Sequence, residues 1–343
     1  MSLRKPKWLW SAGIAIATVA VVGSFALVRN LDRLRTAQPY LEFRIDGMGG
    51  VNELGLLEHK NLLVSATDDA AIRFWDRDSG AVVATLTAKF GPADLLAVDP
   101  KEKWIVVNYQ PAYRHKPAVA IWDVETQTMT GQLEMPNADI SCLAANPDGD
   151  TLAVGSLDGS GRLWSVSKQK EIRLLEGRQW RSKALDFNPD GSMLVSGGNT
   201  IELWETRTGA KLRSIEVPDH IRSVLFLPES TRFAAGGNGS VRMFDATSGK
   251  LESSWNTPDV YRSAITKLRL SPDGNLLASG DQLSNLDIWD LRNGVLARSF
   301  TGCHATSISG LQFNRSGDAI FTASNLDPQE SLPGGELRLW RIK

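Results

Sequence analysis

Residues that could carry out chemistry are few in this chain, and none of them has the spacing of a known catalytic motif. The 343 residues include four histidines and two cysteines, which leaves little for a metal site built from thiolates or imidazoles. The sequence contains no Walker loop, dinucleotide-binding glycine pattern, HExxH zinc motif or GxSxG nucleophile elbow. We therefore expect no catalytic residue, no metal and no cofactor.

The acidic residues that stand out lie in recurring turns. Pro-Asp-Gly occurs at residues 147–149, 189–191 and 272–274. Proline presets φ at the first turn position, aspartate hydrogen-bonds to the local backbone, and glycine accepts a positive φ. Because these turns fall at the same point of successive repeats, we interpret their aspartates as structural.

The two cysteines also favour a structural interpretation. Cys142 lies in a predicted inner strand and is interpreted as a small core residue. Cys303 precedes another such strand, where its thiol could be exposed. The two positions fall in distant repeats, so we expect no disulfide bond between them.

An aromatic residue that recurs along the chain indicates the secondary-structure elements in which the aspartates and cysteines lie. Its successive copies are separated by 47, 42, 40, 40, 45 and 51 residues. Short strands of small residues lie upstream of most copies, and a glycine-containing turn and a further strand follow them. This period is typical of a four-stranded β repeat and not of helix pairs. The copies are Trp75, Trp122, Trp164, Trp204, Phe244, Trp289 and Trp340.

The pattern resembles the WD40 repeat, whose characteristic dipeptide is intact at Trp75-Asp76, Trp122-Asp123 and Trp289-Asp290. The resemblance covers about residues 39–343 and implies an all-β, seven-bladed propeller. The last repeat stops after its third strand, while a strand-like segment, Leu41–Asp46, precedes the first repeat. We expect Leu41–Asp46 to complete the last blade and so to remove an open sheet edge.

The resemblance also implies a hydrogen-bonding role inside the blades for a few polar residues. Asp69 and Asp158 stand six residues before Trp75 and Trp164, as the family pattern requires. His304 stands at the expected distance before the inner strand of the last repeat. These three residues and the recurring aromatics are therefore expected to be structural.

The N-terminal segment has the composition of a membrane anchor. Residues 8–28 carry no charge and match the about 20 apolar residues that a spanning helix needs. They follow a basic tail, residues 1–7, and precede a linker, residues 29–38. We expect an uncleaved single-pass helix in the lipid bilayer; a cleaved signal peptide and a buried helix of a soluble domain are the alternatives.

The orientation of this anchor depends on the charges beside it. Three basic residues flank the apolar segment on each side, and the α-amino group tips the balance toward a cytoplasmic N-terminus. We therefore expect the propeller on the extracytoplasmic (periplasmic) side, with a cytoplasmic propeller as the alternative.

The charge of the repeat region bears on its partners. The whole chain has a net charge of -1, and residues 37–343 hold 32 basic and 38 acidic residues, a net charge of -6. A mildly acidic domain is a poor candidate for following a phosphate backbone. We expect a protein partner and no nucleic acid.

Several predicted loops carry more aromatic and arginine residues than turns require. Trp, Tyr and Arg dominate binding hot spots, because they combine a large contact area with directional donors. The alternative interpretation is that these are ordinary exposed loops. The candidates for contact with a partner are Tyr109, Tyr113, Arg114, Arg178, Trp180, Arg181, His220, Arg222, Tyr261 and Arg262.

These features favour a non-catalytic protein–protein interaction scaffold. We expect a membrane-tethered propeller that acts as a subunit or assembly factor of a membrane-associated complex. The alternative is a secreted or membrane-anchored propeller that binds a small ligand, or acts as an enzyme, through its central channel. That alternative requires convergent acids or histidines, and the sequence shows no such set.

Overall fold

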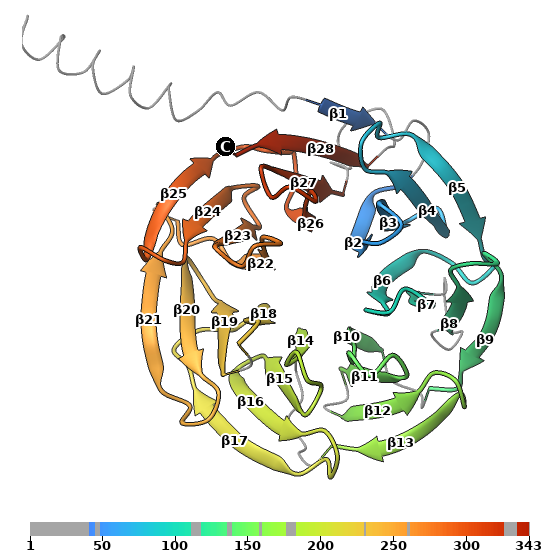
Figure 1. Ribbon diagram of the computed structural model, residues 1–343, viewed down its shortest axis with the longest axis horizontal. Helices are drawn as coiled ribbons and strands as arrows, with labels where there is room; N and C mark the ends of the chain where they lie inside the picture. Colours follow the sequence, from blue (N-terminus) through green and yellow to red (C-terminus); the bar gives the residue numbers. More distant parts are fainter. Residues whose placement is uncertain are drawn as a thin grey trace, which may run out of the picture. The chain divides into compact units, whose positions relative to one another are not determined.

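The computed structural model describes the backbone of residues 41–44 and residues 49–110, 118–135, 139–157, 160–175, 183–229, 231–258, 261–325 and 335–342. Within these ranges, 28 strands form seven antiparallel sheets of four strands each. The sheets stand around a central axis like the blades of a propeller (Figure 1). The predicted all-β, seven-bladed architecture is therefore confirmed.

Each blade runs from an inner strand at the axis to an outer strand at the rim (Figure 1). The first four blades contain β2 (Val51–Leu57), β3 (Leu62–Thr67), β4 (Ala71–Asp76) and β5 (Val82–Thr87); β6 (Ala93–Val98), β7 (Trp104–Tyr109), β8 (Ala118–Asp123) and β9 (Met129–Leu133); β10 (Ile140–Ala145), β11 (Thr151–Ser156), β12 (Gly161–Ser165) and β13 (Lys170–Leu174); β14 (Ala184–Phe187), β15 (Met193–Gly197), β16 (Thr200–Glu205) and β17 (Lys211–Glu216). The last three contain β18 (Ser223–Phe226), β19 (Arg232–Gly236), β20 (Ser240–Asp245) and β21 (Leu251–Asn256); β22 (Ile265–Leu270), β23 (Leu276–Asp281), β24 (Leu286–Asp290) and β25 (Val295–Phe300); β26 (Ile308–Phe313), β27 (Ala319–Ser324), β28 (Glu336–Arg341) and β1 (Leu41–Arg44).

The last blade is closed by the strand that comes first in the sequence. β1 pairs antiparallel with β28, with Leu41 opposite Leu339 and Arg44 opposite Glu336. The predicted closing strand is confirmed over Leu41–Arg44, and residues 45 and 46 lie outside the described residues. Because β1 pairs with β28, the third strand of the last blade has no unpaired edge.

Side chains of the third strands form the core between neighbouring blades. Successive residues of a strand point to opposite faces of its sheet, so Phe74 packs with Ile105 of the second blade while Trp75 packs with Phe321 of the last blade. All seven recurring aromatics are buried, at 0–7% exposure. Replacing such a side chain with alanine costs about 3–5 kcal/mol, so this repeated position is a main source of stability.

The Pro-Asp-Gly turns join blades as well as strands. In the turn at residues 146–150, the Asp148 carboxylate accepts hydrogen bonds from the backbone N–H groups of Asp150 and Thr151, at 2.7 and 2.8 Å. Asn146 donates its side-chain amide to the carbonyl of Gly191 in the next blade, at 3.0 Å. Gly191 has a φ of 74°, which favours glycine. These contacts hold the turns of adjacent blades together.

The N-terminal segments named in the sequence analysis lie outside the described residues. These are the basic tail 1–7, the apolar segment 8–28 and the linker 29–38. In the part of the chain that the structure describes, no helix is both long enough and apolar enough to cross a membrane.

Candidate functional site

A hydrogen-bond network fills the interior of the last blade. The Thr322 hydroxyl accepts from the indole N–H of Trp340 at 2.8 Å and lies 2.6 Å from His304 Nε2. The other ring nitrogen of His304 lies 3.2 Å from the Glu336 carboxylate, which also contacts Arg338. The hydrogen bond from His304, and then the charge of Arg338, lower the pKa of Glu336 to about 2 although burial opposes the shift. This network is a structural device, because all its groups are used within the blade.

Only some other blades keep the corresponding hydrogen bond. The indole N–H groups of Trp75 and Trp289 donate to the hydroxyls of Ser65 and Ser279, at 3.0 and 2.9 Å. In the second and third blades the strand register places valine at the hydroxyl position. Among the described residues, the indole N–H of Trp164, in the third blade, has no acceptor.

The two aspartates that the resemblance singled out have different outcomes. Asp69 accepts from the Thr67 hydroxyl at 2.5 Å and pairs with the Arg73 guanidinium, also at 2.5 Å. Hydrogen bonds from Arg73 and Thr67 lower the Asp69 pKa against the opposing effect of burial, which is the largest single contribution. Asp158 lies outside the described residues.

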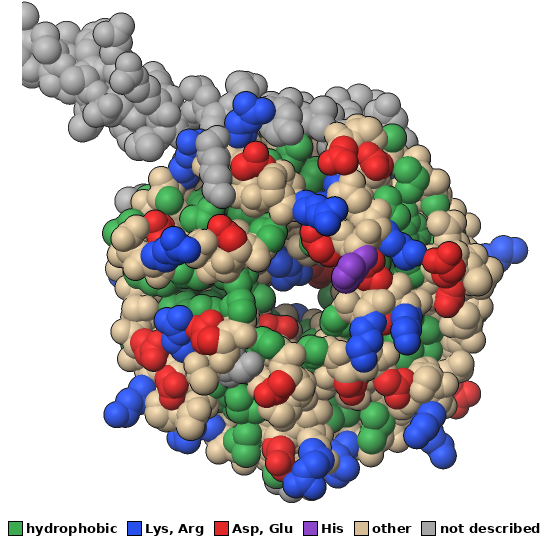
Figure 2. Space-filling model, in the orientation of Figure 1, with side chains coloured by type: hydrophobic (Ala, Val, Ile, Leu, Met, Phe, Trp, Pro, Cys, Tyr) green, Lys and Arg blue, Asp and Glu red, His purple; other side chains and the backbone are tan. Residues whose placement is uncertain are grey.

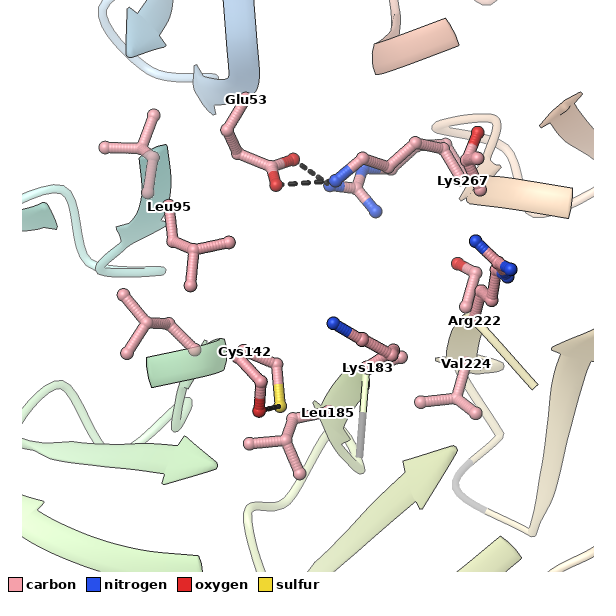
Figure 3. Close-up of a pocket in the computed structure, with 15 residues that line it drawn as sticks. Glu53, Leu95, Cys142, Lys183, Leu185, Arg222, Val224 and Lys267 are labelled. Atoms are coloured by element: carbon pink, nitrogen blue, oxygen red, sulfur yellow. Dashed lines mark hydrogen bonds and ion pairs between the residues drawn. The ribbon is translucent and has the colours of Figure 1, made fainter. Parts of the chain in front are cut away.

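The inner strands enclose a central cavity of about 130 Å³. Figure 3 shows side chains from different blades pointing into it, with Glu53 and Lys267 on one side and Cys142, Lys183 and Leu185 on the other. Typical small-molecule pockets have volumes of roughly 300–1,000 Å³. The volume of this cavity lies below that range and matches one inserted side chain.

An ion pair bridges the cavity between the first and sixth blades. Lys267 Nζ lies 2.5 Å from the Glu53 carboxylate, and Arg269 lies 3.9 Å from the other carboxylate oxygen (Figure 3). Both Glu53 and Lys267 are largely buried side chains. The pair links the sixth blade to the first, and the single carboxylate of Glu53 stands against the two cations Lys267 and Arg269.

The opposite side of the cavity is basic. Lys183 precedes β14 and Arg222 precedes β18, so both stand where an inner strand begins. Both are exposed, and neither forms an ion pair with another described residue. His220, whose Nδ1 lies 2.9 Å from Asn199 Oδ1, has a lowered pKa because of burial and then the charges of Arg222 and Lys183.

Burial raises the pKa of two carboxyl groups on the inner strands. Burial raises the pKa of Asp186, on β14, to about 7, although the N–H of Phe226 donates to it at 2.7 Å. Burial also raises the pKa of Asp94, on β6, and the nearby charge of Glu53 adds to this effect.

One side of the propeller is formed by two sets of loops, and we call this side the connection face. One set joins an outer strand to the next blade, and the other joins second to third strands. His220 and Arg222 lie there before β18, and Tyr261 and Arg262 before β22. Tyr261 is 81% exposed, the largest exposure among the described large hydrophobic side chains.

The predicted loop position of Tyr109 is wrong. β7 continues through this residue, which pairs with Ala93 of β6 and has no exposed surface. Its ring packs against Phe90, with the ring centroids 5.5 Å apart. Burial of this ring raises the pKa of the Tyr109 hydroxyl, which stays a neutral phenol in the core. The other candidates, Tyr113, Arg114, Arg178, Trp180 and Arg181, lie outside the described residues.

Both cysteines are buried thiols that form no disulfide bond. Cys142 lines the cavity and is 5% exposed. The expectation of an exposed Cys303 is wrong: its side chain packs with Phe300, Ile308 and neighbouring apolar residues, and burial raises its pKa to about 12. In the described ranges, no group of three or more His, Cys, Asp or Glu residues could hold a metal ion.

Sequence reasoning missed the charged residues of the cavity wall. Lys183, Lys267 and Glu53 lie at or near the beginning of inner strands, and none of them is among the predicted binding residues. The available signal was polar residues alternating with apolar ones, as in Lys183-Ala-Leu-Asp-Phe and Thr266-Lys-Leu-Arg-Leu. That alternation indicates a strand with one face to solvent.

Comparison with protein families agrees with this geometry. The family model described as "WD domain, G-beta repeat" matches residues 125–165, 170–205, 209–245 and 255–290. The chain thus contains WD40 repeats, and the structure arranges them with the unmatched repeats as a seven-bladed propeller.

Several characterised proteins resemble parts of the chain. Telomerase protein component 1 of Rattus norvegicus is 23% identical over 279 residues, which cover 80% of this chain and 10% of that protein. Protein groucho of Drosophila melanogaster is 26% identical over 216 residues, 60% of this chain and 28% of that protein. Small ribosomal subunit protein RACK1y of Oryza sativa subsp. japonica is 31% identical over 159 residues, 44% of this chain and 47% of that protein. The chain therefore spans less than half the length of each of these relatives.

Proposed function

We propose that this chain is a non-catalytic interaction scaffold that binds a protein partner through its connection face. The observation that carries the proposal is Tyr261, an aromatic side chain that is 81% exposed beside Arg262 and one blade away from Arg222. Exposed Tyr and Arg side chains are favourable anchors for a protein surface, since each buries a large area and offers a directed donor.

The small central cavity supports a scaffold over an enzyme. At about 130 Å³, it is smaller than the pockets that usually hold substrates or cofactors. Its acidic and basic groups on the first and sixth blades are engaged with each other, as the Glu53–Lys267 distance of 2.5 Å shows.

The mixed surface charge supports a protein partner over a nucleic acid. On the face shown in Figure 2, Lys and Arg side chains are interspersed with Asp and Glu side chains and do not gather by sign. Strong binding to a phosphate backbone requires several cations acting together. The names of two relatives, a telomerase protein component and a small ribosomal subunit protein, also place those proteins in larger assemblies.

The scaffold is proposed to be tethered to a membrane by residues 8–28. The support is the uncharged run of 21 residues, which is sufficient to span the hydrocarbon core. The test is alkaline carbonate extraction of membranes that contain the full chain or a chain lacking residues 1–38. Retention of the full chain and release of the shortened chain are expected, whereas release of both would contradict the tether.

Site-specific photo-crosslinking tests the connection face. A photo-reactive phenylalanine derivative replaces Tyr261 in the full chain, and a matched chain carries it at Arg207, in the turn between β16 and β17 on the opposite side. Crosslinks to another protein from position 261 and not from position 207 are expected. Crosslinks of equal yield from both positions, or from position 207 alone, would show that the connection face is not the docking surface.

A further inference from the structure

The central cavity has an uneven distribution of charge that its internal ion pairs do not balance. Lys183, Arg222, Lys267 and Arg269 come from the fourth to sixth blades, while the carboxylate of Glu53 comes from the first. Glu53 engages Lys267 and, at longer distance, Arg269. Lys183 and Arg222 are then left as two exposed cations with no ion-pair partner among the described residues.

The geometry places these two cations at one entrance of the cavity. They stand one residue before β14 and β18, on neighbouring blades, and both line the cavity (Figure 3). The depressed pKa of His220, which falls partly because of Arg222 and Lys183, indicates that their positive fields overlap at this entrance. Two like charges on the wall of one opening both attract an anion bound there, so they stabilise it more than either does alone.

The walls below this entrance are apolar. Leu95, Leu185 and Val224 line the cavity from the second, fourth and fifth blades. A side chain with an aliphatic stem and a terminal carboxylate matches this combination, because its stem meets the leucines and its charge stays beside the cations. The guanidinium of Arg222 can bind a carboxylate through two parallel hydrogen bonds, which adds direction to the attraction.

We propose that the cavity entrance formed by Lys183 and Arg222 binds an acidic side chain, glutamate or aspartate, carried by an extended segment of the protein partner. The inference rests on the proposed scaffold function and gives its partner a chemistry. The volume of about 130 Å³ admits one inserted side chain. The adjoining connection face, with Tyr261 exposed on the next blade, supplies a surface for the residues that flank it.

The binding test uses the full-length chain in a neutral detergent and a fluorescein-labelled peptide, GSELEEGS, with its amide counterpart GSQLQQGS. Fluorescence anisotropy at low salt measures both affinities. The acidic peptide should bind, and the paired substitutions Lys183→Gln and Arg222→Gln should weaken it at least tenfold, or about 1.4 kcal/mol. The control Lys250→Gln, an exposed cation in the turn after β20, should leave the affinity unchanged.

Charge removal is preferred to charge reversal here, because it introduces no new repulsion. Circular dichroism of each variant verifies the fold, and the single variants Lys183→Gln and Arg222→Gln should each give a smaller loss than the pair. Equal binding of GSQLQQGS, an equal loss in Lys250→Gln, or no binding of the acidic peptide would overturn the proposal. Displacement of the peptide by inorganic phosphate at the same concentration as by unlabelled peptide would assign the entrance to simple anions and would also overturn it.

The outcome can be separated from that of the scaffold proposal. If crosslinking from position 261 persists in the paired Lys183→Gln and Arg222→Gln variant with unchanged yield, the partner docks without using the cavity entrance. If the acidic peptide binds as expected but position 261 gives no crosslink, the entrance is correct and the connection-face scaffold is wrong.

Discussion

The hydrogen bond inside the last blade offers a quantitative test of how this propeller is stabilised. The perturbation is Thr322→Val, which keeps the shape of the side chain and removes its hydroxyl. Thr322 has no exposed surface, and its hydroxyl contacts both Trp340 Nε1 and His304 Nε2, at 2.8 and 2.6 Å. The substitution leaves two buried polar groups unpaired, each at a cost of about 1–3 kcal/mol. We expect the free energy of unfolding to fall by about 2–6 kcal/mol.

The third blade supplies the reverse experiment. Val154 occupies the position that corresponds to Thr322, because Leu152 lies opposite Trp164 as Ile320 lies opposite Trp340. The Trp164 indole N–H has no acceptor among the described residues. Val154→Thr provides one, so we expect a gain of about 0.5–1.5 kcal/mol in the free energy of unfolding.

Equilibrium urea unfolding of the full-length protein, followed by tryptophan fluorescence and by circular dichroism, measures both changes. A control combines Thr322→Val with Trp340→Phe. The fifth blade has such an apolar pair naturally, with Ala235 and Phe244 at the two corresponding positions. Thr322→Val should cost less in that background, because no indole N–H is left unpaired. Shifts of the same sign for Thr322→Val and Val154→Thr, or a cost that is unchanged in the phenylalanine background, would refute the reasoning.

Three other results are expected from the same structure. In the full-length protein, Asp186→Asn should reduce the pH dependence of stability. The folded-state pKa of about 7 is raised, so wild-type stability falls as pH rises from about 4 to 7, by at most about 1.4 kcal/mol per unit; parallel unfolding-versus-pH curves for the two proteins would contradict this. A chain that begins after Arg44 should unfold at lower urea than one that begins after Gln38, since it lacks β1, and equal midpoints would exclude a closing role. Native Cys303 should resist alkylation at pH 8 and react once urea is added, because burial raises its pKa to about 12; mass spectrometry showing rapid native modification would contradict its burial.

Much of the architecture follows from local patterns in the sequence. The spacing of the recurring aromatics predicts seven four-stranded units, because each unit must bury the same side chain against its neighbour. The segment that begins at Leu41 is predicted as the closing strand because it has the character of the fourth strands, and the pairing of β1 with β28 confirms it. The patterns that predict these features each lie within a single repeat or segment of the chain.

The character of the cavity depends on residues far apart in the chain. Glu53 and Lys267 are 214 positions apart and meet at 2.5 Å only because the blades close into a ring. Lys183 and Arg222 likewise come from separate repeats and line the same cavity because their inner strands start at the same entrance. Tyr109 shows the same limit in reverse, since its sequence context suggests a loop while the neighbouring blade buries it completely. Local sequence therefore determined the period and the order of the strands, whereas ring closure decided which charges are paired, which remain free and which aromatic side chains are exposed.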